Sequence, residues 1–186
     1  MPIPFKEKTV ALKNETFTVR AATADDIDLV IDFRKRMFAE MGISDDSFIE
    51  NSWDVVRTQY LEDLKQDRLR HFIAYTRDNR PAASAGTLLK SDFPYYLFKP
   101  GFYGWILDVY TLPEYRGHGL ADRLMQHNHQ WIIDKGGLEA KLIASGAGAR
   151  KLYEREGYQS TWDLSLSLTE TKTFNGLIDA RSNTNG

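Results

Sequence analysis

A strand that runs through a glycine-bearing loop straight into a helix is the feature that most constrains the fold. The segment FYGWILDVYTL, residues 102–112, has the aromatic and β-branched content typical of a buried strand. The stretch YRGHGLADRLM begins at residue 115, and Leu120, Leu124 and Trp131 then recur at helical spacing. A strand, a tight loop and a helix in this order indicate an α/β (α+β) fold and place the first helical amides beside the loop.

Hydrophobic periodicity and turn residues predict the order β-α-α-β-β-β-α-β-α-β in a single domain. The domain is expected to span residues 16–170, after an extension of residues 1–15 and before a partly disordered tail of residues 171–186. The predicted strands are residues 15–23, 71–76, 82–90, 102–112, 138–145 and 158–168. The predicted helices are residues 24–41, 51–69, 119–135 and 149–156.

The composition disfavours several classes of protein. A net charge of -2 supplies no basic field for nucleic acid, and the absence of cysteine removes disulfides and cysteine nucleophiles. His127 and His129 are two residues apart on a helix and point to different faces, so no metal site is expected. The N-terminus lacks a signal-peptide pattern and no segment approaches ~18 apolar residues. We therefore expect a cytoplasmic protein with neither a membrane nor a nucleic acid as its partner.

The loop between the predicted strand 102–112 and the predicted helix 119–135 suits a diphosphate group. The first N–H groups of a helix have no partner within it, and the helix dipole adds partial positive charge there. Gly117 and Gly119 let the backbone approach a ligand, and Arg116 adds a permanent charge. A Walker loop does not fit, because Gly-Lys-Ser/Thr is missing, and a dinucleotide fingerprint does not fit, because Asp122 stands where its third glycine belongs.

The segment VYTLPEYRGHGLADRLM resembles the coenzyme A loop of the GNAT superfamily, the GCN5-related N-acetyltransferases. The family pattern is Arg/Gln-x-x-Gly-x-Gly/Ala, which Arg116, Gly119 and Ala121 match. The later segment LIASGAGARKLYEREGY is similar to the family's second cofactor segment, with Leu152 and Tyr153 on its helix. The resemblance covers roughly residues 16–168. It implies the GNAT fold, a mixed and mostly antiparallel central sheet with a splayed parallel strand pair, flanked by helices.

The resemblance implies acetyl-CoA as the cosubstrate. Its pantetheine arm would lie between the splayed strands 103–111 and 139–145, and the amides of the loop would bind its diphosphate. Many relatives have an asparagine where Gly146 stands, so either Ser145 replaces that side-chain contact or the backbone alone supplies it. The implied cofactor-binding residues are Val109, Thr111, Arg116, Gly117, His118, Gly119, Leu120, Ala121 and Ser145.

Two residues are the candidate catalytic groups. Tyr153 matches the family tyrosine near the cofactor sulfur, which acts as a general acid or donates a hydrogen bond to the leaving thiolate. Asp108 lies inside the strongest strand, where an ionised carboxylate needs water, a partner or a chemical role. In relatives an acidic residue near this position binds the amine or relays its proton, and a structural ion pair is the alternative.

These features predict an N-acetyltransferase that passes an acetyl group directly to the amine of a small molecule or peptide, without an acyl-enzyme. The alternatives are a non-catalytic acyl-CoA sensor of the same fold and, on Gly117-x-Gly119 alone, a nicotinamide oxidoreductase. The aromatic loop, residues 93–98, favours a partly apolar or ring-bearing acceptor, and the mild net acidity favours a cationic one. Members of the family are commonly dimers, so a homodimer is an expected assembly.

Overall fold

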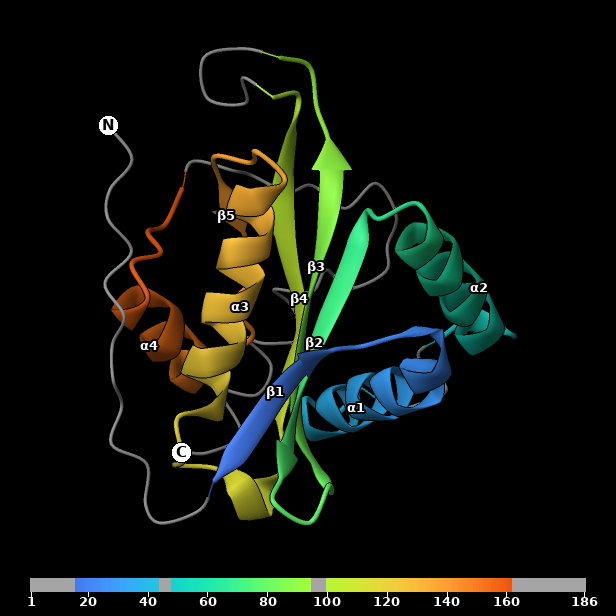
Figure 1. Ribbon diagram of the computed structural model, residues 1–186, viewed down its shortest axis with the longest axis vertical. Helices are drawn as coiled ribbons and strands as arrows, with labels where there is room; N and C mark the ends of the chain where they lie inside the picture. Colours follow the sequence, from blue (N-terminus) through green and yellow to red (C-terminus); the bar gives the residue numbers. More distant parts are fainter. Residues whose placement is uncertain (1–15, 44–47, 95–99, 162–186) are drawn as a thin grey trace. The chain divides into compact units, whose positions relative to one another are not determined.

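A computed structural model of the protein describes residues 16–43, 48–94 and 100–161 (Figure 1). The predicted extension and tail, and most of the predicted strand 158–168, lie outside these residues. The chain divides into two compact units, residues 1–142 and residues 143–186, and each is described by itself. The predicted domain boundaries stay a prediction.

The first unit contains a five-stranded sheet in which the strands follow one another in sequence order. These strands are β1 (Phe17–Ala21), β2 (Leu69–Thr76), β3 (Pro81–Ser91), β4 (Phe102–Thr111) and β5 (Ala140–Lys141). The pairings from β1 to β4 are antiparallel, and β5 pairs parallel to β4. The mixed, mostly antiparallel sheet with one parallel pair is therefore confirmed.

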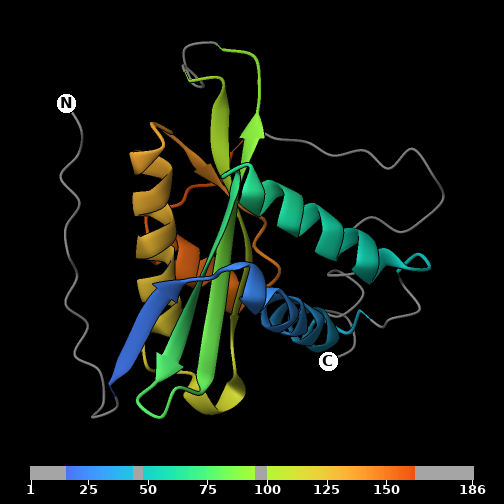
Figure 2. The same ribbon diagram turned by 45° about the vertical axis from the view of Figure 1, so that its right-hand side comes forward.

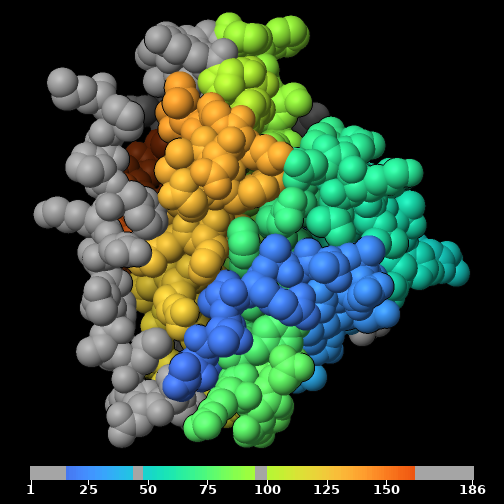
Figure 3. All heavy atoms as spheres, viewed as in Figure 1, coloured from blue at the N-terminus to red at the C-terminus, as the bar shows by residue number. Residues whose placement is uncertain are grey.

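Helices cover both faces of this sheet. The helices α1 (Ile27–Glu40) and α2 (Ser52–Lys65) pack on one face, and α3 (Leu120–Asp134) packs on the other against β2, β3 and β4 (Figure 1). Figure 2 shows the two layers separated by the sheet, and the all-atom view shows the neighbouring surfaces of α1 and α2 (Figure 3).

Two apolar clusters fix these layers. Under α1 and α2, side chains such as Phe33 and Ile73 are almost completely buried, and under α3 the same holds for Leu120 and Leu124. Each buried side chain of this size stabilises the fold by about 1.5–3 kcal/mol relative to an exposed one. The predicted helical spacing of Leu120 and Leu124 therefore has a direct counterpart in the packing.

Some element boundaries differ from the sequence prediction. The second helix ends at Lys65 rather than at residue 69, because Asp67 has a positive φ of 55° and Leu69 already pairs with Leu88 in the sheet. A 3₁₀ turn, η3 (Pro113–Tyr115), precedes the glycine loop. The fifth strand is much shorter than the predicted segment 138–145, since β5 contains only Ala140 and Lys141.

β4 contains one more residue than its partner at a single point. Ser84 of β3 pairs with Tyr110 and Gly86 pairs with Leu107, so two residues of β4 lie opposite the one residue between Ser84 and Gly86. The first of the two, Asp108, has a φ of 56°, in the left-handed region that few residues other than glycine adopt. This geometry is that of a β-bulge.

The bulge changes which side chains face which layer. Leu107 packs against the cluster under α1, and Tyr110, three residues later, belongs to the same cluster. Val109 packs against the cluster under α3, while Asp108 contacts side chains of α1 and α2. The bulge thus brings an ionisable side chain into the α1 layer from the middle of the central strand.

Candidate active site

The loop between β4 and α3 has a backbone that requires glycine. Gly117 has a φ of 78°, and Gly119, the residue before the first turn of α3, has a φ of 69°. A side chain at either position would be strained. The 15-residue helix α3 then begins at Leu120, so its first amides and its dipole face this loop. Local geometry of this kind suits an anionic ligand.

Arg116 connects this loop to α1 and to β4. Its Nη2 lies 2.8 Å and 2.7 Å from the two carboxylate oxygens of Glu40, and its Nε donates to the carbonyl oxygen of Thr111 at 3.0 Å. The hydroxyl of Tyr110 donates to Glu40 at 2.6 Å. Burial and this bond to Glu40 raise the pKa of Tyr110 to about 12. The guanidinium of Arg116 therefore holds the loop in place through its own protein contacts.

The side chain of His118 turns back toward its own loop. Its Nδ1 lies 3.1 Å from the carbonyl oxygens of Tyr115 and Arg116, and its ring packs edge-on against Phe17 at a centroid distance of 5.6 Å. The imidazole of His118 is therefore held within its own loop.

Asp108 accepts hydrogen bonds from three elements of the first unit. The donors are Arg34 of α1, the hydroxyl of Tyr60 of α2, and His71 of β2, whose Nε2 lies 3.1 Å from Oδ2. Arg34 also donates to the hydroxyl of Tyr60 at 3.0 Å. We call these four residues the Asp108 cluster; the carboxylate at its centre is buried, with a side-chain exposure of 1%.

The charges of the Asp108 cluster support one another. Burial alone would raise the pKa of Asp108, but the hydrogen bond from His71 and the positive charge of Arg34 outweigh it and hold that pKa below its usual value. Burial, together with the negative charge of Asp108, raises the pKa of Tyr60. The cluster therefore contains an ionised Asp108 paired with a charged Arg34, which matches the structural alternative left open by the sequence.

The sequence analysis missed the three donors of this cluster, although two of them left a signal. Arg34 occupies the gap in the apolar stripe between Ile31 and Phe38, three residues after the first and four before the second, each about one helical turn. His71 alternates with Leu69 and Ile73 on the buried face of β2. A polar residue at an apolar position of this kind indicates a buried partner.

Val109 and Thr111, the predicted backbone contacts of the cosubstrate, lie near the end of β4. In the described residues the β4–β5 ladder consists of Gly104 with Ala140 and Trp105 with Lys141, and the Gly104 amide donates to Glu139 at 2.9 Å. The ladder does not continue beside Val109 and Thr111. One edge of the second half of β4 is thus without a β5 partner over this range.

The second unit carries the other two predicted residues. Its helix α4 (Ala147–Arg155) begins after Gly146, and Ser145 lies just before it, partly buried. Tyr153 of α4 has 8% of its surface exposed, and burial raises its pKa to about 12. Its ring packs edge-on against Tyr158 at a centroid distance of 5.8 Å. Tyr153 is therefore a protonated phenol at neutral pH.

Two structural features are absent from the described ranges. Among these residues, no group of three or more metal-ligating side chains is placed to hold an ion. In the same ranges, no helix has the length and apolar character that a membrane span requires. His127, one of the two histidines considered for a metal, stacks on Phe72 at a centroid distance of 5.3 Å.

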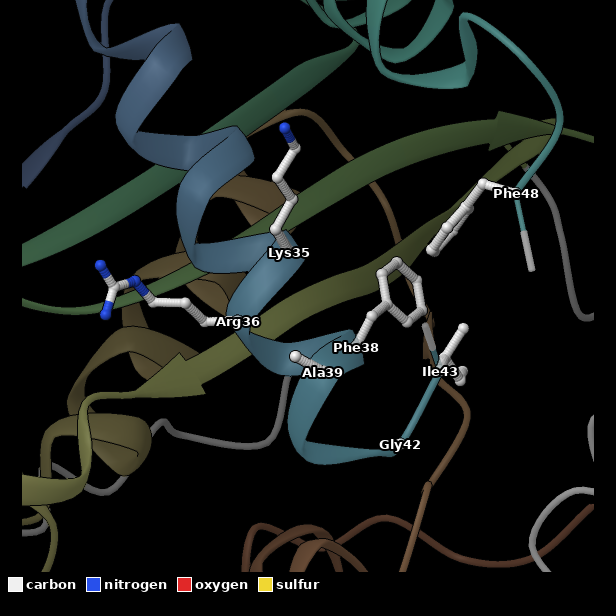
Figure 4. Close-up of a pocket in the computed structure, with 7 residues that line it drawn as sticks. All are labelled: Lys35, Arg36, Phe38, Ala39, Gly42, Ile43 and Phe48. Atoms are coloured by element: carbon white, nitrogen blue, oxygen red, sulfur yellow. The ribbon is translucent and has the colours of Figure 1, made fainter. Parts of the chain in front are cut away.

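A surface pocket of about 480 Å³ lies at the C-terminal end of α1. Phe38 and Phe48 pack edge-on in its wall, with ring centroids 5.3 Å apart, and Ile43 lies below them (Figure 4). Lys35 and Arg36 are on its rim, where Arg36 pairs with Asp32 at 2.7 Å. The pocket is therefore mainly apolar and aromatic, with a basic edge.

Three solved structures are similar to this chain over most of their length. A predicted acetyltransferase from Clostridium acetobutylicum with acetyl-CoA shares 26% identity over 85% of this chain and 100% of that chain, with a TM-score of 0.76. A GCN5-related N-acetyltransferase from Ralstonia eutropha JMP134 shares 25% identity over 82% of this chain and 99% of that chain, with a TM-score of 0.73. The aminoglycoside N-acetyltransferase AAC(6')-Iy in complex with CoA shares the fold, with a TM-score of 0.64. It has 17% identity over 87% of this chain and 100% of that chain. A search of curated protein sequences gave no match.

The sheet, its two helical layers and the glycine loop before α3 define an acyltransferase of mixed α/β architecture. The model of the acetyltransferase (GNAT) family matches residues 36–158, which is more than half of the chain. The chain belongs to this family, whose chemistry is the transfer of acetyl groups.

Proposed function

We propose that this protein transfers an acetyl group from acetyl-CoA directly to the amine of a small molecule or peptide. The observation that carries the proposal is the loop at Gly117 and Gly119, whose positive φ angles open the backbone before the first amides of α3. Family membership and a similar structure with acetyl-CoA from Clostridium acetobutylicum support the same cosubstrate. In this proposal the amides from Arg116 to Ala121 bind the diphosphate, while Val109, Thr111 and Ser145 contact the pantetheine arm.

The proposed reaction joins the amine nitrogen to the thioester carbon. The neutral amine attacks, the carbonyl oxygen becomes negative, and the carbon–sulfur bond then breaks with the electron pair left on sulfur. Tyr153 donates its phenolic proton to the departing thiolate, or a hydrogen bond to it, and the proton lost by the amine restores the balance through solvent. Because burial raises the pKa of Tyr153 to about 12, the phenol is protonated at neutral pH and can act as the donor.

The catalytic role of Asp108 remains a prediction, and its contacts favour an indirect one. A general base needs a free lone pair within reach of the amine, whereas the carboxylate of Asp108 is buried and accepts from Arg34, Tyr60 and His71. A pKa below the usual value also makes it a weak base. We therefore propose that Asp108 acts on the reaction through the backbone that it holds.

The acceptor is proposed to be an amine with an apolar part. AAC(6')-Iy has been solved with the bisubstrate analogue CoA-S-monomethyl-acetylneamine, which supports a small-molecule amine for a protein of this fold. The pocket lined by Phe38, Ile43 and Phe48 would accept an aliphatic or aromatic group, and Lys35 on its rim disfavours a second positive charge there. The homodimer and the cytoplasmic location stay predictions.

Release of free thiol from acetyl-CoA in the presence of an amine panel tests the proposal. The panel should pair each amine with its N-acetylated form, which cannot react, and should include aminoglycosides, polyamines, aromatic amines and peptide N-termini. Amine-dependent thiol release with a matching acetylated product supports the proposal. Tight CoA binding by calorimetry with no turnover on any amine would instead favour the non-catalytic sensor, and the lack of CoA binding would remove both.

A further inference from the structure

We infer that His71 and Gly86 are positioning residues for acetyl transfer. His71 crosses the face of β3 at Gly86 to reach Asp108, and it thereby holds the β4 bulge in the geometry in which the backbone of Val109 meets the cosubstrate. The inference rests on the proposed function, because it assigns these residues a part in that same reaction.

The first step is the path of the His71 side chain. His71 is in β2 and Asp108 is in β4, and β3 lies between these strands in the sheet. The residue of β3 that pairs with His71 is Gly86. A Cβ atom at Gly86 would lie closer than 3.0 Å to three atoms of the imidazole ring, a separation that real Cβ atoms do not show. The ring therefore lies directly on the backbone of Gly86.

The second step is the reason for a glycine at this position. Gly86 is not among the residues with a positive φ, so its backbone conformation is open to any residue. The three heavy atoms nearest to a side chain at this position all belong to the imidazole ring of His71. The absence of a side chain at Gly86 thus leaves room for the imidazole ring of His71, and the hydrogen bond from His71 to Asp108 depends on that room.

The third step connects the cluster to the bulge. Asp108 is the bulged residue and has a left-handed backbone conformation, which persists only where the surroundings enforce it. Its three donors come from α1, α2 and β2, so the carboxylate is fixed from three directions. Loss of the His71 donor releases one of these directions and lets the bulge relax.

The fourth step connects the bulge to the reaction. Val109 follows Asp108 directly, so any rotation at Asp108 moves the N–H and C=O groups of Val109. A displacement of about 1 Å in a reacting geometry can lower a rate by about 10²-fold. The diphosphate loop is held separately, because Arg116 is tied to Glu40 and Thr111. Loss of the hydrogen bond from His71 should therefore lower kcat for acetyl transfer and leave the affinity for CoA unchanged.

The experiment compares two glycine substitutions in the full-length protein. Gly86→Ala displaces the His71 ring, and Gly104→Ala is the matched control, since its Cβ would meet Ile132 of α3 with comparable overlap and without touching the Asp108 cluster. For each variant, kcat is measured per CoA-binding site counted by calorimetry. We expect Gly86→Ala to lower this kcat by about 10-fold or more with CoA affinity within about twofold of wild type, and Gly104→Ala to lower only the melting temperature.

Substitutions of His71 itself give an independent arm that does not need Gly86→Ala to fold. His71→Gln places an amide N–H at about the reach of Nε2, whereas His71→Asn is one methylene shorter. We expect His71→Gln to retain most of kcat and His71→Asn to lose it. Equal rates for the two variants, or an unchanged kcat per binding site in Gly86→Ala, would overturn the inference.

A measurement without turnover separates this inference from the proposed function. The backbone amide resonance of Val109 in the free protein should shift in Gly86→Ala and His71→Asn and stay in place in Gly104→Ala and His71→Gln. If the Val109 resonance does not shift in Gly86→Ala and His71→Asn, the inference is wrong whether or not the protein is active. A wild-type protein that binds no CoA sinks the proposed function, and the coupling of His71 to the bulge is then decided by this resonance.

Discussion

Arg116, in the glycine loop, makes a two-oxygen contact with Glu40, the last residue of α1, at 2.8 Å and 2.7 Å. The carboxylate lies at the end of a helix where the dipole disfavours negative charge, and the guanidinium offsets that effect. Arg116 therefore links the proposed diphosphate site to the helix that ends at the aromatic pocket. This contact leads to the first prediction.

Arg116→Ala and Glu40→Ala should weaken CoA binding to a similar degree, by about 3- to 10-fold, which is about 0.7–1.4 kcal/mol. Both substitutions remove the same tether and leave the loop amides in place. Calorimetric titration with CoA measures the effect, with Arg36→Ala as the control, because Arg36 pairs with Asp32 on α1. If Arg116→Ala alone weakens binding, and does so more at low salt, the guanidinium contacts phosphate directly.

The second prediction concerns the stability of the Asp108 cluster. Asp108→Ala leaves the charge of Arg34 and the polar groups of Tyr60 and His71 without their acceptor, which should cost about 3–5 kcal/mol in the free energy of unfolding. Urea denaturation measures this loss. Asp32→Ala breaks the exposed ion pair with Arg36 on α1, the helix that carries Arg34, and should cost about 0–1 kcal/mol. Similar losses for the two variants would show that the cluster contributes little to stability.

The third prediction is a dependence of stability on acid. The pKa of Asp108 is lower in the folded state than its ordinary value of about 3.9, so the unfolded chain binds more protons between the two values. The stabilisation from this residue is therefore complete above about pH 5 and is lost as the pH falls through the folded-state pKa. Urea midpoints between pH 2 and 6 should fall more steeply for wild type than for Asp108→Asn, and parallel curves would contradict this.

The fourth prediction concerns Tyr153. Tyr153→Phe should lower kcat by about 10²-fold and leave CoA affinity unchanged, because it removes only the proton donor. Since burial raises the pKa of Tyr153 to about 12, the wild-type rate should show no tyrosine-dependent decline between pH 7 and 10. Tyr158→Phe, on the ring that packs against Tyr153, is the control. A loss of CoA affinity in Tyr153→Phe, with kcat retained, would count against a role in proton transfer.

Much of the fold could be predicted from the sequence because local signals agreed with one another. The apolar stripe of α3 and the strands predicted at residues 71–76 and 82–90 fall where the structure has them, and the glycine loop has the positive φ angles that its residues favour. The short β5 was overestimated, because an apolar run such as LEAKLIAS contains no information on how far a neighbouring strand pairs with it.

The Asp108 cluster shows where sequence reasoning ends. An acidic residue in a buried strand predicts a partner, and the partner here is assembled from α1, α2 and β2, whose juxtaposition depends on tertiary packing. The bulge at Asp108 leaves no pattern in the sequence either, since aspartate gives only a weak signal for a positive φ. The glycine that admits the His71 ring is visible only once the register of β2 and β3 is known.

The extra residue in β4 also sets a limit on how the length of this strand can vary. Deleting Asp108 would remove the bulge and leave Val109 alone opposite Ala85, so that Leu107 and Tyr110 would stay in the α1 layer and Val109 in the α3 layer. Deleting a neighbouring residue of β4 would instead turn at least one side chain to the opposite face of the sheet. A deletion scan through β4 should therefore find that folding survives the loss of Asp108 better than the loss of its neighbours, whereas the proposed reaction, which needs the bulge, does not survive it.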